Sequence, residues 1–510
     1  MISTTAPIEE ANHEDLLGHY INGKYVNETV RTGDVYNPAT GKKIKQLALA
    51  DAEIIDQAII AAEQAFLSWR NSSPISRARI MFRFKELLEE HADSIIKLVT
   101  QEHGKVLEDA MGELKRGIEI IEYACGTPEL LKGEYTKNVG GDIDSWSEFQ
   151  PLGVVAGITP FNFPVMVPMW MYPMAIICGN TFILKPSEKD PGASLYIADL
   201  LSQAGLPDGV LNIINGDSET VELLLMDERI SAISFVGSSK IAEVIYETGS
   251  KYGKRVQALG GAKNHAVVMP DADIDNVVKS LTGAAFGSCG ERCMAISVAV
   301  CVGDDTADKV VSGLTEEIIN FKIGNGIDSG MDLGPLISGE HKQKILDYID
   351  TGVEEGATLV VDGRNISVTG HQDGFFLGGC LFDHVKPNMK ICKEEIFGPV
   401  LCIVRASNLD EAMKIIESNP YGNGTCIYTR DGGLAKYFSD NINVGMVGVN
   451  VPLPVPVAYH SFGGWKRSLF GDLSIYGPDS IRFYTRRKTI SQRWPTDSAE
   501  KAQFSFPSNQ

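Results

Sequence analysis

Short apolar runs alternate with longer amphipathic segments along the chain from Pro151 onward. Helical periodicity of apolar residues marks residues 194–204, 219–225 and 240–252. Apolar runs with the length of buried strands lie at residues 154–158, 181–184, 210–214, 232–236 and 265–269. Strands that alternate with helices are joined by right-handed crossovers into a parallel sheet. The pattern therefore predicts a doubly wound α/β sheet.

A second series of apolar runs follows Val277. Its strands are expected at residues 297–302, 359–361, 400–404, 424–428 and 446–449. The chain has 510 residues, which is more than one hydrophobic core usually organises. We therefore predict two doubly wound α/β domains, the second of which holds Cys293. Residues 51–66 and 75–95 carry helical periodicity, so the N-terminal region is predicted to begin with helices.

Two segments fall outside both series. Residues 137–150 and 480–490 resemble hairpins or strands, and we expect them to pair across a subunit interface. The polar stretch at 495–510 is rich in Ser, Gln and Lys and is predicted to be unstructured or draped over a subunit.

Composition and charge exclude several kinds of partner. The formal net charge is -20 and no basic run occurs, which argues against nucleic acid. The most apolar window, residues 165–178, is broken by Pro168 and Pro173 and is too short to span a bilayer. Nine scattered cysteines fit a reducing compartment, and residues 1–18 resemble neither a signal nor a transit peptide. We predict a cytoplasmic protein without a membrane partner.

Cys293 stands in a segment of small, turn-permissive residues with Arg292 beside it. A glycine-flanked sulfur is open to a substrate, and a neighbouring guanidinium favours the thiolate and so lowers the thiol pKa. Most cysteines are instead buried as small apolar residues. From this segment alone both interpretations, a nucleophile and a core residue, stay open.

The commonest phosphate-binding signatures, Gly-x-Gly-x-x-Gly and the Walker loop, are absent from the sequence. Looser candidates remain at the ends of two predicted strands. Ser238 opens a helix, where backbone amides and a hydroxyl suit a pyrophosphate, although an ordinary N-cap serine is the simpler explanation. Lys185 and Glu188 follow another strand, where they suit ribose hydroxyls or form a surface ion pair.

No metal site is predicted. Cys289, Cys293 and Cys301 lack the Cys-x-x-Cys spacing of structural zinc sites, and no His-Glu-x-x-His occurs. Cys289 is close enough in sequence to Cys293 for a regulatory disulfide under oxidation, which we state as a hypothesis.

Six motifs in the same order and spacing resemble those of the aldehyde dehydrogenase superfamily. They read TPFNFP at 159–164, KPSE at 185–188, FVGS at 235–238, GERC at 290–293, EEIFGP at 394–399 and FGGWK at 462–466. The resemblance implies an NAD-binding domain (residues 1–136 and 151–265), a catalytic domain (266–450) and a β oligomerisation arm (137–150 and 480–495). It also implies a homo-oligomer, a dimer or tetramer.

The resemblance also implies roles for single residues. Cys293 matches the nucleophile that attacks the aldehyde, and Asn162 matches the oxyanion-hole amide, which stabilises the charge that develops on the carbonyl oxygen. The remaining matches concern NAD: Lys185 and Glu188 for the adenosine ribose, Ser238 for the pyrophosphate, Glu395 for the nicotinamide ribose and Phe397 for the nicotinamide ring. Phe161 is also expected to bind the cofactor. Glu188 would repel a 2′-phosphate, which favours NAD over NADP.

One departure narrows the expected reaction. Hydrolytic members of the superfamily place a glutamate 34 residues before the nucleophile, and 293 − 34 gives Leu259 here. Leucine accepts no proton, so the base that activates water is missing. A thiol attacks a thioester without that base, which favours coenzyme A as the second substrate.

With Gly-Ala-Lys-Asn-His and Gly-Glu-Arg-Cys-Met-Ala, the chain resembles the CoA-acylating methylmalonate-semialdehyde dehydrogenase family. In that family Arg292 and an arginine matching Arg116 hold the substrate carboxylate, a task that suits guanidinium forks. A solvated helix charge is the simpler explanation for Arg116.

The family usually has Asn or Thr where Leu259 stands, so an altered acyl pocket or a related substrate is an open alternative. A hydrolysing aldehyde dehydrogenase that recruits Glu291 as its base is a second alternative.

Overall fold

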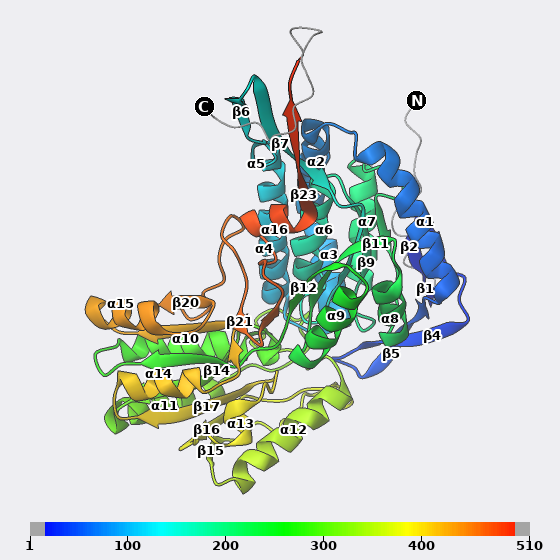
Figure 1. The fold of residues 1–510 in the computed structure, drawn as a ribbon. Helices are drawn as coiled ribbons and strands as arrows, with labels where there is room; N and C mark the ends of the chain where they lie inside the picture. The colour runs from blue at the N-terminus through cyan, green and yellow to red at the C-terminus, as the bar shows by residue number, and fades with distance from the viewer. Residues whose placement is uncertain (1–15, 495–510) are drawn as a thin grey trace.

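The computed structural model describes residues 16–494, and the two ends of the chain lie outside this range. The predicted tail at 495–510 and the first 15 residues of the predicted NAD-binding domain therefore fall outside the described residues. Within the described range the chain forms two large α/β layers, one above the other in Figure 1.

The first layer is an eight-stranded sheet in the order β22-β12-β11-β8-β9-β10-β2-β3. Its strands are β2 (His19–Ile21), β3 (Lys24–Val26), β8 (Val154–Ile158), β9 (Thr181–Lys185), β10 (Leu211–Ile213), β11 (Ile230–Val236), β12 (Arg255–Leu259) and β22 (Leu469–Phe470). The central strands β12, β11, β8, β9 and β10 are parallel. Short antiparallel strands close both edges, β22 beside β12 and β2 beside β10.

Helices cover both faces of this sheet because its central strands are apolar on both sides. Val154 and Ala156 of β8 face a cluster with helices α1, α8 and α9, whereas Val155 faces the cluster of α2, α3, α4, α6 and α7. The bounds of these helices are α1 (Ala52–Trp69), α2 (Pro74–Glu90), α3 (Ala92–His103), α4 (Leu107–Cys125), α6 (Met166–Ile177), α7 (Gly192–Gln203), α8 (Ser218–Met226) and α9 (Ser239–Lys251). The alternation along β8 follows from the period of two in a strand.

The second layer is a seven-stranded sheet in the order β15-β16-β17-β14-β13-β19-β20, with only the edge strand β15 antiparallel. Its strands are β13 (Asn264–Val268), β14 (Ile296–Val302), β15 (Thr358–Val361), β16 (Cys380–Asp383), β17 (Val400–Ala406), β19 (Gly424–Tyr428) and β20 (Met446–Val449). Helices α10 (Ile274–Phe286) and α11 (Asp304–Ile319) pack on one face. On the other face pack α12 (Gly339–Glu354), α13 (Lys390–Lys393), α14 (Leu409–Glu417) and α15 (Gly432–Asn441). The prediction of two doubly wound α/β layers is confirmed.

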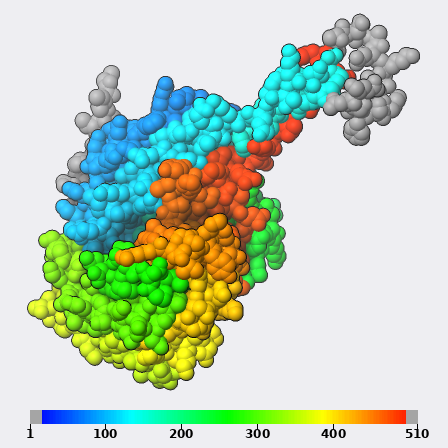
Figure 2. All heavy atoms as spheres, turned by 90° about the vertical axis from the view of Figure 1, so that its left-hand side faces the viewer, coloured from blue at the N-terminus to red at the C-terminus, as the bar shows by residue number. Residues whose placement is uncertain are grey.

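A third, antiparallel sheet stands apart from both layers. It contains β6 (Tyr135–Gly140), β7 (Ile143–Pro151) and β23 (Thr485–Gln492), in the order β23-β7-β6. Figure 2 shows these strands reaching away from the body of the molecule. The two segments predicted to lie outside the α/β series therefore pair with each other within one chain.

Four sequence predictions need correction. The described chain begins with strands rather than helices: β1 (Leu16–Leu17), β4 (Arg31–Asn37) and β5 (Lys42–Leu49) form a small sheet, and β2 and β3 join the first layer. The helix predicted at 75–95 is two helices, α2 and α3, which meet at His91. Residues 480–484, predicted as part of a strand, end the helix α16 (Pro478–Tyr484). Finally, the strand predicted at 265–269 as the last of the first series is β13, which lies inside the second sheet between β14 and β19.

The described part of the chain contains no helix that is both long and apolar enough to cross a membrane.

Candidate active site

The loop that carries Cys293 joins α10 to β14 through a tight turn. Ser288, Cys289 and Gly290 in this turn all have positive φ, at 51°, 54° and 74°. At Gly290 an added Cβ would lie 2.2 Å from the carbonyl oxygen of Gly398, so a glycine is required where the two loops meet. The turn separates the two sulfurs: Cys289 is fully buried with its sulfur 3.9 Å from the Leu377 carbonyl oxygen, whereas Cys293 is partly exposed. Both are free thiols.

Cys293 opens into a cavity of about 380 Å³ that lies between α4, α6 and the loop of Cys293 itself. Arg292 and Arg116 line the same cavity, so the structure brings together three residues that the sequence singled out. The rest of the wall is acidic along α4 and apolar elsewhere, and it comprises Glu108, Asp109, Gly112, Glu113, Phe163, Met166, Trp170, Met294, Leu453, Val455 and Phe462.

Each arginine in the cavity already has a carboxylate partner. Arg292 donates from Nη2 to Asp109 at 2.5 Å and from Nη1 to the carbonyl oxygen of Gly283 at 3.3 Å. Arg116 donates from Nη1 to Glu119 at 2.6 Å and from Nη2 to the carbonyl oxygen of Pro456 at 2.6 Å. A guanidinium has five N–H donors, so both groups keep donors for a further anion.

The thiol of Cys293 does not have the lowered pKa that the sequence predicted. Burial, and after it the carboxylate of Glu395, raise the pKa of Cys293 to about 12, and the opposing effect of Arg292 is smaller. The physical reason is that burial disfavours the charged thiolate by more than the guanidinium of Arg292 favours it, and Glu395 acts in the same direction as burial. Arg292 therefore does not activate the sulfur in the way expected from its position in the sequence.

Asn162 lies in the turn between β8 and α6 and is 3% exposed. A buried ion pair holds this turn: Lys105 donates to Glu113 at 2.7 Å and to the Asn162 carbonyl oxygen at 2.6 Å. The other oxygen of Glu113 accepts from the backbone amides of Val165 and Met166, where α6 begins. The sequence does not reveal this pair, because a Lys and a Glu near a helix give no signal that both are buried.

Cys293 also borders a narrow space with Glu395 and Phe397, two of the residues predicted to contact the cofactor. Glu395 accepts from the backbone amide of Ala262 at 2.9 Å, and burial raises its pKa to about 7. Phe397 meets Phe161 edge to face, with ring centroids 5.9 Å apart. The structure thus places Phe161, Glu395 and Phe397 on the side of Cys293 where the two layers meet.

The other predicted cofactor residues lie at the carboxyl ends of two parallel strands of the first sheet. Lys185 ends β9 and pairs with Glu188 at 3.1 Å. Ser238 follows β11 as the N-cap of α9, yet its side chain makes no capping hydrogen bond. The buried hydroxyl in this region belongs instead to Ser239, which accepts from the backbone amide of Gly261. The carboxyl edge of such a sheet is where open α/β folds bind ligands.

These residues fit a dinucleotide. The exposed Ser238 hydroxyl and the free amides at the start of α9, a helix of 13 residues, suit a pyrophosphate. Gly237 leaves no room for a side chain, because an added Cβ would lie 2.5 Å from the ring of Phe235.

Leu259 ends β12 and is 3% exposed, in the same apolar cluster against which Cys293 packs. Glu291, considered as a substitute base for water, is fully buried and turns away from both spaces around Cys293. It accepts from the backbone amide of Ile337 at 3.2 Å and lies 3.6 Å from His341, and burial raises its pKa to about 8.

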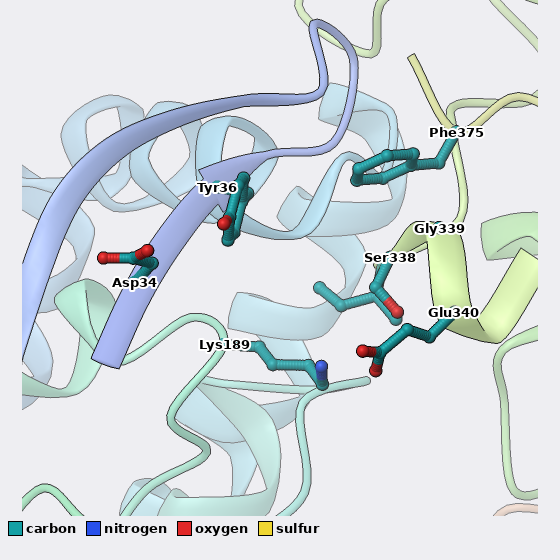
Figure 3. A pocket seen from close by; sticks show the side chains of 8 residues that line it. Asp34, Tyr36, Lys189, Ser338, Gly339, Glu340 and Phe375 are labelled. Atoms are coloured by element: carbon teal, nitrogen blue, oxygen red, sulfur yellow. The ribbon is translucent and has the colours of Figure 1, made fainter. Parts of the chain in front are cut away.

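A further cavity of about 290 Å³ lies between β4 and the start of α12. Figure 3 shows Lys189 and Glu340 extending toward each other across it, with the rings of Tyr36 and Phe375 on another side. It shares no lining residue with the two spaces around Cys293. Among the described residues no group of three or more His, Cys, Asp or Glu side chains is arranged to hold a metal ion.

A partly exposed cysteine in a cavity between two α/β layers is an arrangement that suits an enzyme with a thiol nucleophile. The model of the aldehyde dehydrogenase family matches residues 25–490. The chain belongs to the aldehyde dehydrogenase family.

Several named proteins are similar to this chain in sequence and in structure. The chain is 64% identical over 493 residues to malonate-semialdehyde dehydrogenase of Pseudomonas aeruginosa, covering 96% of this chain and 99% of the relative. The crystal structure of methylmalonate-semialdehyde dehydrogenase from Oceanimonas doudoroffii is 64% identical, with a TM-score of 0.94 and coverage of 94% of this chain and 99% of that one. A structure from Sinorhizobium meliloti 1021 complexed with NAD is 50% identical, with a TM-score of 0.94 and coverage of 95% and 99%.

Proposed function

We propose that the chain is an NAD-dependent, CoA-acylating dehydrogenase of methylmalonate and malonate semialdehyde. The observation that carries this proposal is the cavity in which Cys293 lies with two arginines. A thiol beside two guanidinium groups suits an aldehyde that also carries a carboxylate. The relatives named for malonate and methylmalonate semialdehyde, at up to 64% identity, support the same substrate.

In the proposed reaction the Cys293 sulfur adds to the aldehyde carbon. Asn162 and the backbone amide of Cys293 hold the oxyanion, and Arg116 and Arg292 hold the carboxylate. Bound NAD+ supplies the hydride acceptor. The sulfur is left as a thioester, and the β-carboxylate departs as CO2 while its electron pair forms an enolate, which takes up a proton. The thiol of coenzyme A then attacks the thioester carbonyl and releases Cys293.

The buried leucine at position 259 supports CoA over water as the acyl acceptor. A side chain without a proton acceptor gives water no general base, whereas a thiol needs none for attack on a thioester. The products are propionyl-CoA from methylmalonate semialdehyde and acetyl-CoA from malonate semialdehyde.

The decisive experiment measures NADH formation with and without CoA and identifies the product by mass spectrometry. We expect steady turnover only with CoA, with acyl-CoA as product, and a single burst of NADH without it. Equal steady rates without CoA, with release of free acid, would establish the alternative, a hydrolysing aldehyde dehydrogenase.

We further propose that the NAD-binding domain lies within residues 1–136 and 151–265 and ends before β13, because β13 (Asn264–Val268) belongs to the second sheet. The proposed catalytic domain then runs from β13 to residue 450, and residues 137–150 and 480–495 form the proposed oligomerisation arm. The projecting sheet supports the arm, because β6 and β23 each have one edge that no strand within residues 16–494 pairs with. Sedimentation of the intact enzyme distinguishes a monomer from the proposed dimer or tetramer. Nine free cysteines support a reducing, cytoplasmic setting.

A further inference from the structure

Asp109 makes two contacts that no other carboxylate in the cavity makes. Its Oδ1 accepts from Nη2 of Arg292 at 2.5 Å, and its Oδ2 accepts from the backbone amide of Ser288 at 2.8 Å. One side chain on the first turn of α4 therefore holds both the arginine next to the nucleophile and the backbone of the turn that carries it.

The neighbourhood leaves Arg292 little freedom in that position. Its guanidinium packs on Gly287, where an added Cβ would lie 2.4 Å from Nη1. Nη1 also donates to the carbonyl oxygen of Gly283. Arg292 is 19% exposed and Asp109 21%, so the pair is largely shielded from water, where a charge-assisted hydrogen bond orients both partners strongly.

We propose that Asp109 is a positioning residue that sets the preference for carboxylated aldehydes by orienting Arg292. The remaining donors of the guanidinium are then directed into the cavity, toward the substrate carboxylate. The inference rests on the proposed function, in which Arg292 binds that carboxylate.

A purely electrostatic role of Asp109 and a positioning role predict opposite changes in KM when the charge of Asp109 is removed. If Asp109 acted only through its field, its negative charge would repel an anionic substrate, and neutralising it would lower KM. If Asp109 acts by orienting Arg292, the variant Asp109→Asn places an amide N–H donor against a guanidinium that has only donors, so Arg292 is no longer held. KM for the semialdehyde then rises, although a charge that repels the substrate has been removed. The sign of the change in KM separates the two.

The test compares methylmalonate semialdehyde with propanal, which is the same aldehyde with a hydrogen in place of the carboxylate, in the presence of NAD+ and CoA. For Asp109→Asn we expect KM for the semialdehyde to rise roughly tenfold to a hundredfold, the loss typical of a misplaced binding group. For propanal we expect kcat/KM to stay within about twofold, because the amide oxygen of Asn still accepts from Ser288. For Asp109→Ala we expect both substrates to lose activity, because the Ser288 amide also loses its acceptor.

Glu108 provides the matched charge control. It lines the same cavity, is exposed, and forms no ion pair with any other residue of the range 16–494. Glu108→Gln removes the same charge without disturbing an arginine, so KM for the semialdehyde is expected to fall, by up to about threefold. Urea unfolding of each variant checks that the fold is intact.

Three outcomes overturn the inference: a KM in Asp109→Asn that is unchanged or lower, an equal rise in Glu108→Gln, or an equal loss of propanal activity in Asp109→Asn and Asp109→Ala. Failure of the proposed function has a different signature, since the unmodified enzyme itself would then show no preference between the two aldehydes.

Discussion

Replacing Glu113 by Gln tests whether the buried ion pair with Lys105 positions the turn of Asn162, which we propose to bind the oxyanion. Both side chains are fully buried, and their charged atoms lie 2.7 Å apart. The substitution keeps the shape of the side chain and removes its charge. The ammonium of Lys105 is then left without a counter-ion, next to the ring of Phe163 and the carbonyl oxygen of Asn162.

The expected cost follows from these contacts. Removing one partner of a buried pair destabilises a protein by about 3–5 kcal/mol, because the remaining charge stays desolvated. The same change disturbs the turn, since one oxygen of Glu113 fixes the amides of Val165 and Met166. If the turn shifts, Asn162 no longer donates to the oxyanion, and the loss of one such donor lowers kcat by about 10²–10³.

The assay combines urea unfolding with steady-state kinetics for Glu113→Gln, Lys105→Met and the double variant. The double variant buries no uncompensated charge, so it is expected to be more stable than either single variant. Its kcat stays low, because the Asn162 carbonyl still lacks its ammonium donor. Glu129→Gln, which breaks the exposed pair with Lys132, serves as the control and is expected to change neither property.

Two results would refute this reasoning. Additive losses of stability in the double variant would mean that the two charges do not compensate each other. A kcat that follows stability, recovering in the double variant, would mean that the pair supports the fold without positioning Asn162.

Three further predictions concern the sulfur and its surroundings. Cys293→Ala is expected to abolish NADH formation with an unchanged urea midpoint, and retained activity would exclude Cys293 as the nucleophile. Glu395→Gln is expected to speed alkylation of Cys293 by iodoacetamide roughly three- to tenfold at pH 8, because a negative neighbour raises the thiol pKa. Below pH 6 the variant and the parent enzyme should be alkylated at the same rate, because Glu395, with a pKa of about 7, is already protonated there. A ratio of the two alkylation rates that does not change with pH contradicts this prediction. The variant Leu259→Glu is expected to release free acid without CoA, which mass spectrometry measures. Burying the new carboxyl group is expected to lower the free energy of unfolding by a few kcal/mol. If the folded variant still requires CoA for turnover, Leu259 is not what prevents hydrolysis of the thioester.

The apolar runs predicted the central strands well because buried parallel strands are apolar on both faces. Strands with one exposed face were missed, as in β4, where exposed and less exposed residues alternate and only Val35 is fully buried. The assignment of β13 to the first sheet failed for another reason. Only four residues separate β12 from β13, and no local signal shows that the chain passes from one layer to the other between them.

The candidate site also contains residues that the sequence predicted and residues that it did not reveal. Cys293, Arg292 and Arg116 were found from motifs, and the structure places all three in one cavity, although their roles stay predictions. The carboxylates that hold them were not found. A charged residue on a helix is expected to face solvent, and only the tertiary contact with Ser288 shows that Asp109 reaches the loop of Cys293.

The missed carboxylates change the chemical interpretation of the site. A sulfur beside an unpaired guanidinium would be a ready nucleophile before any substrate arrives. Here burial, and after it Glu395, raise the pKa of Cys293 against the smaller effect of Arg292, which is paired with Asp109, so the thiol is favoured over the thiolate. Low reactivity of the resting sulfur protects it from adventitious oxidation and alkylation, which depend on the thiolate. Activation then depends on changes that accompany binding, and neutralising Glu395 is the simplest of these to test.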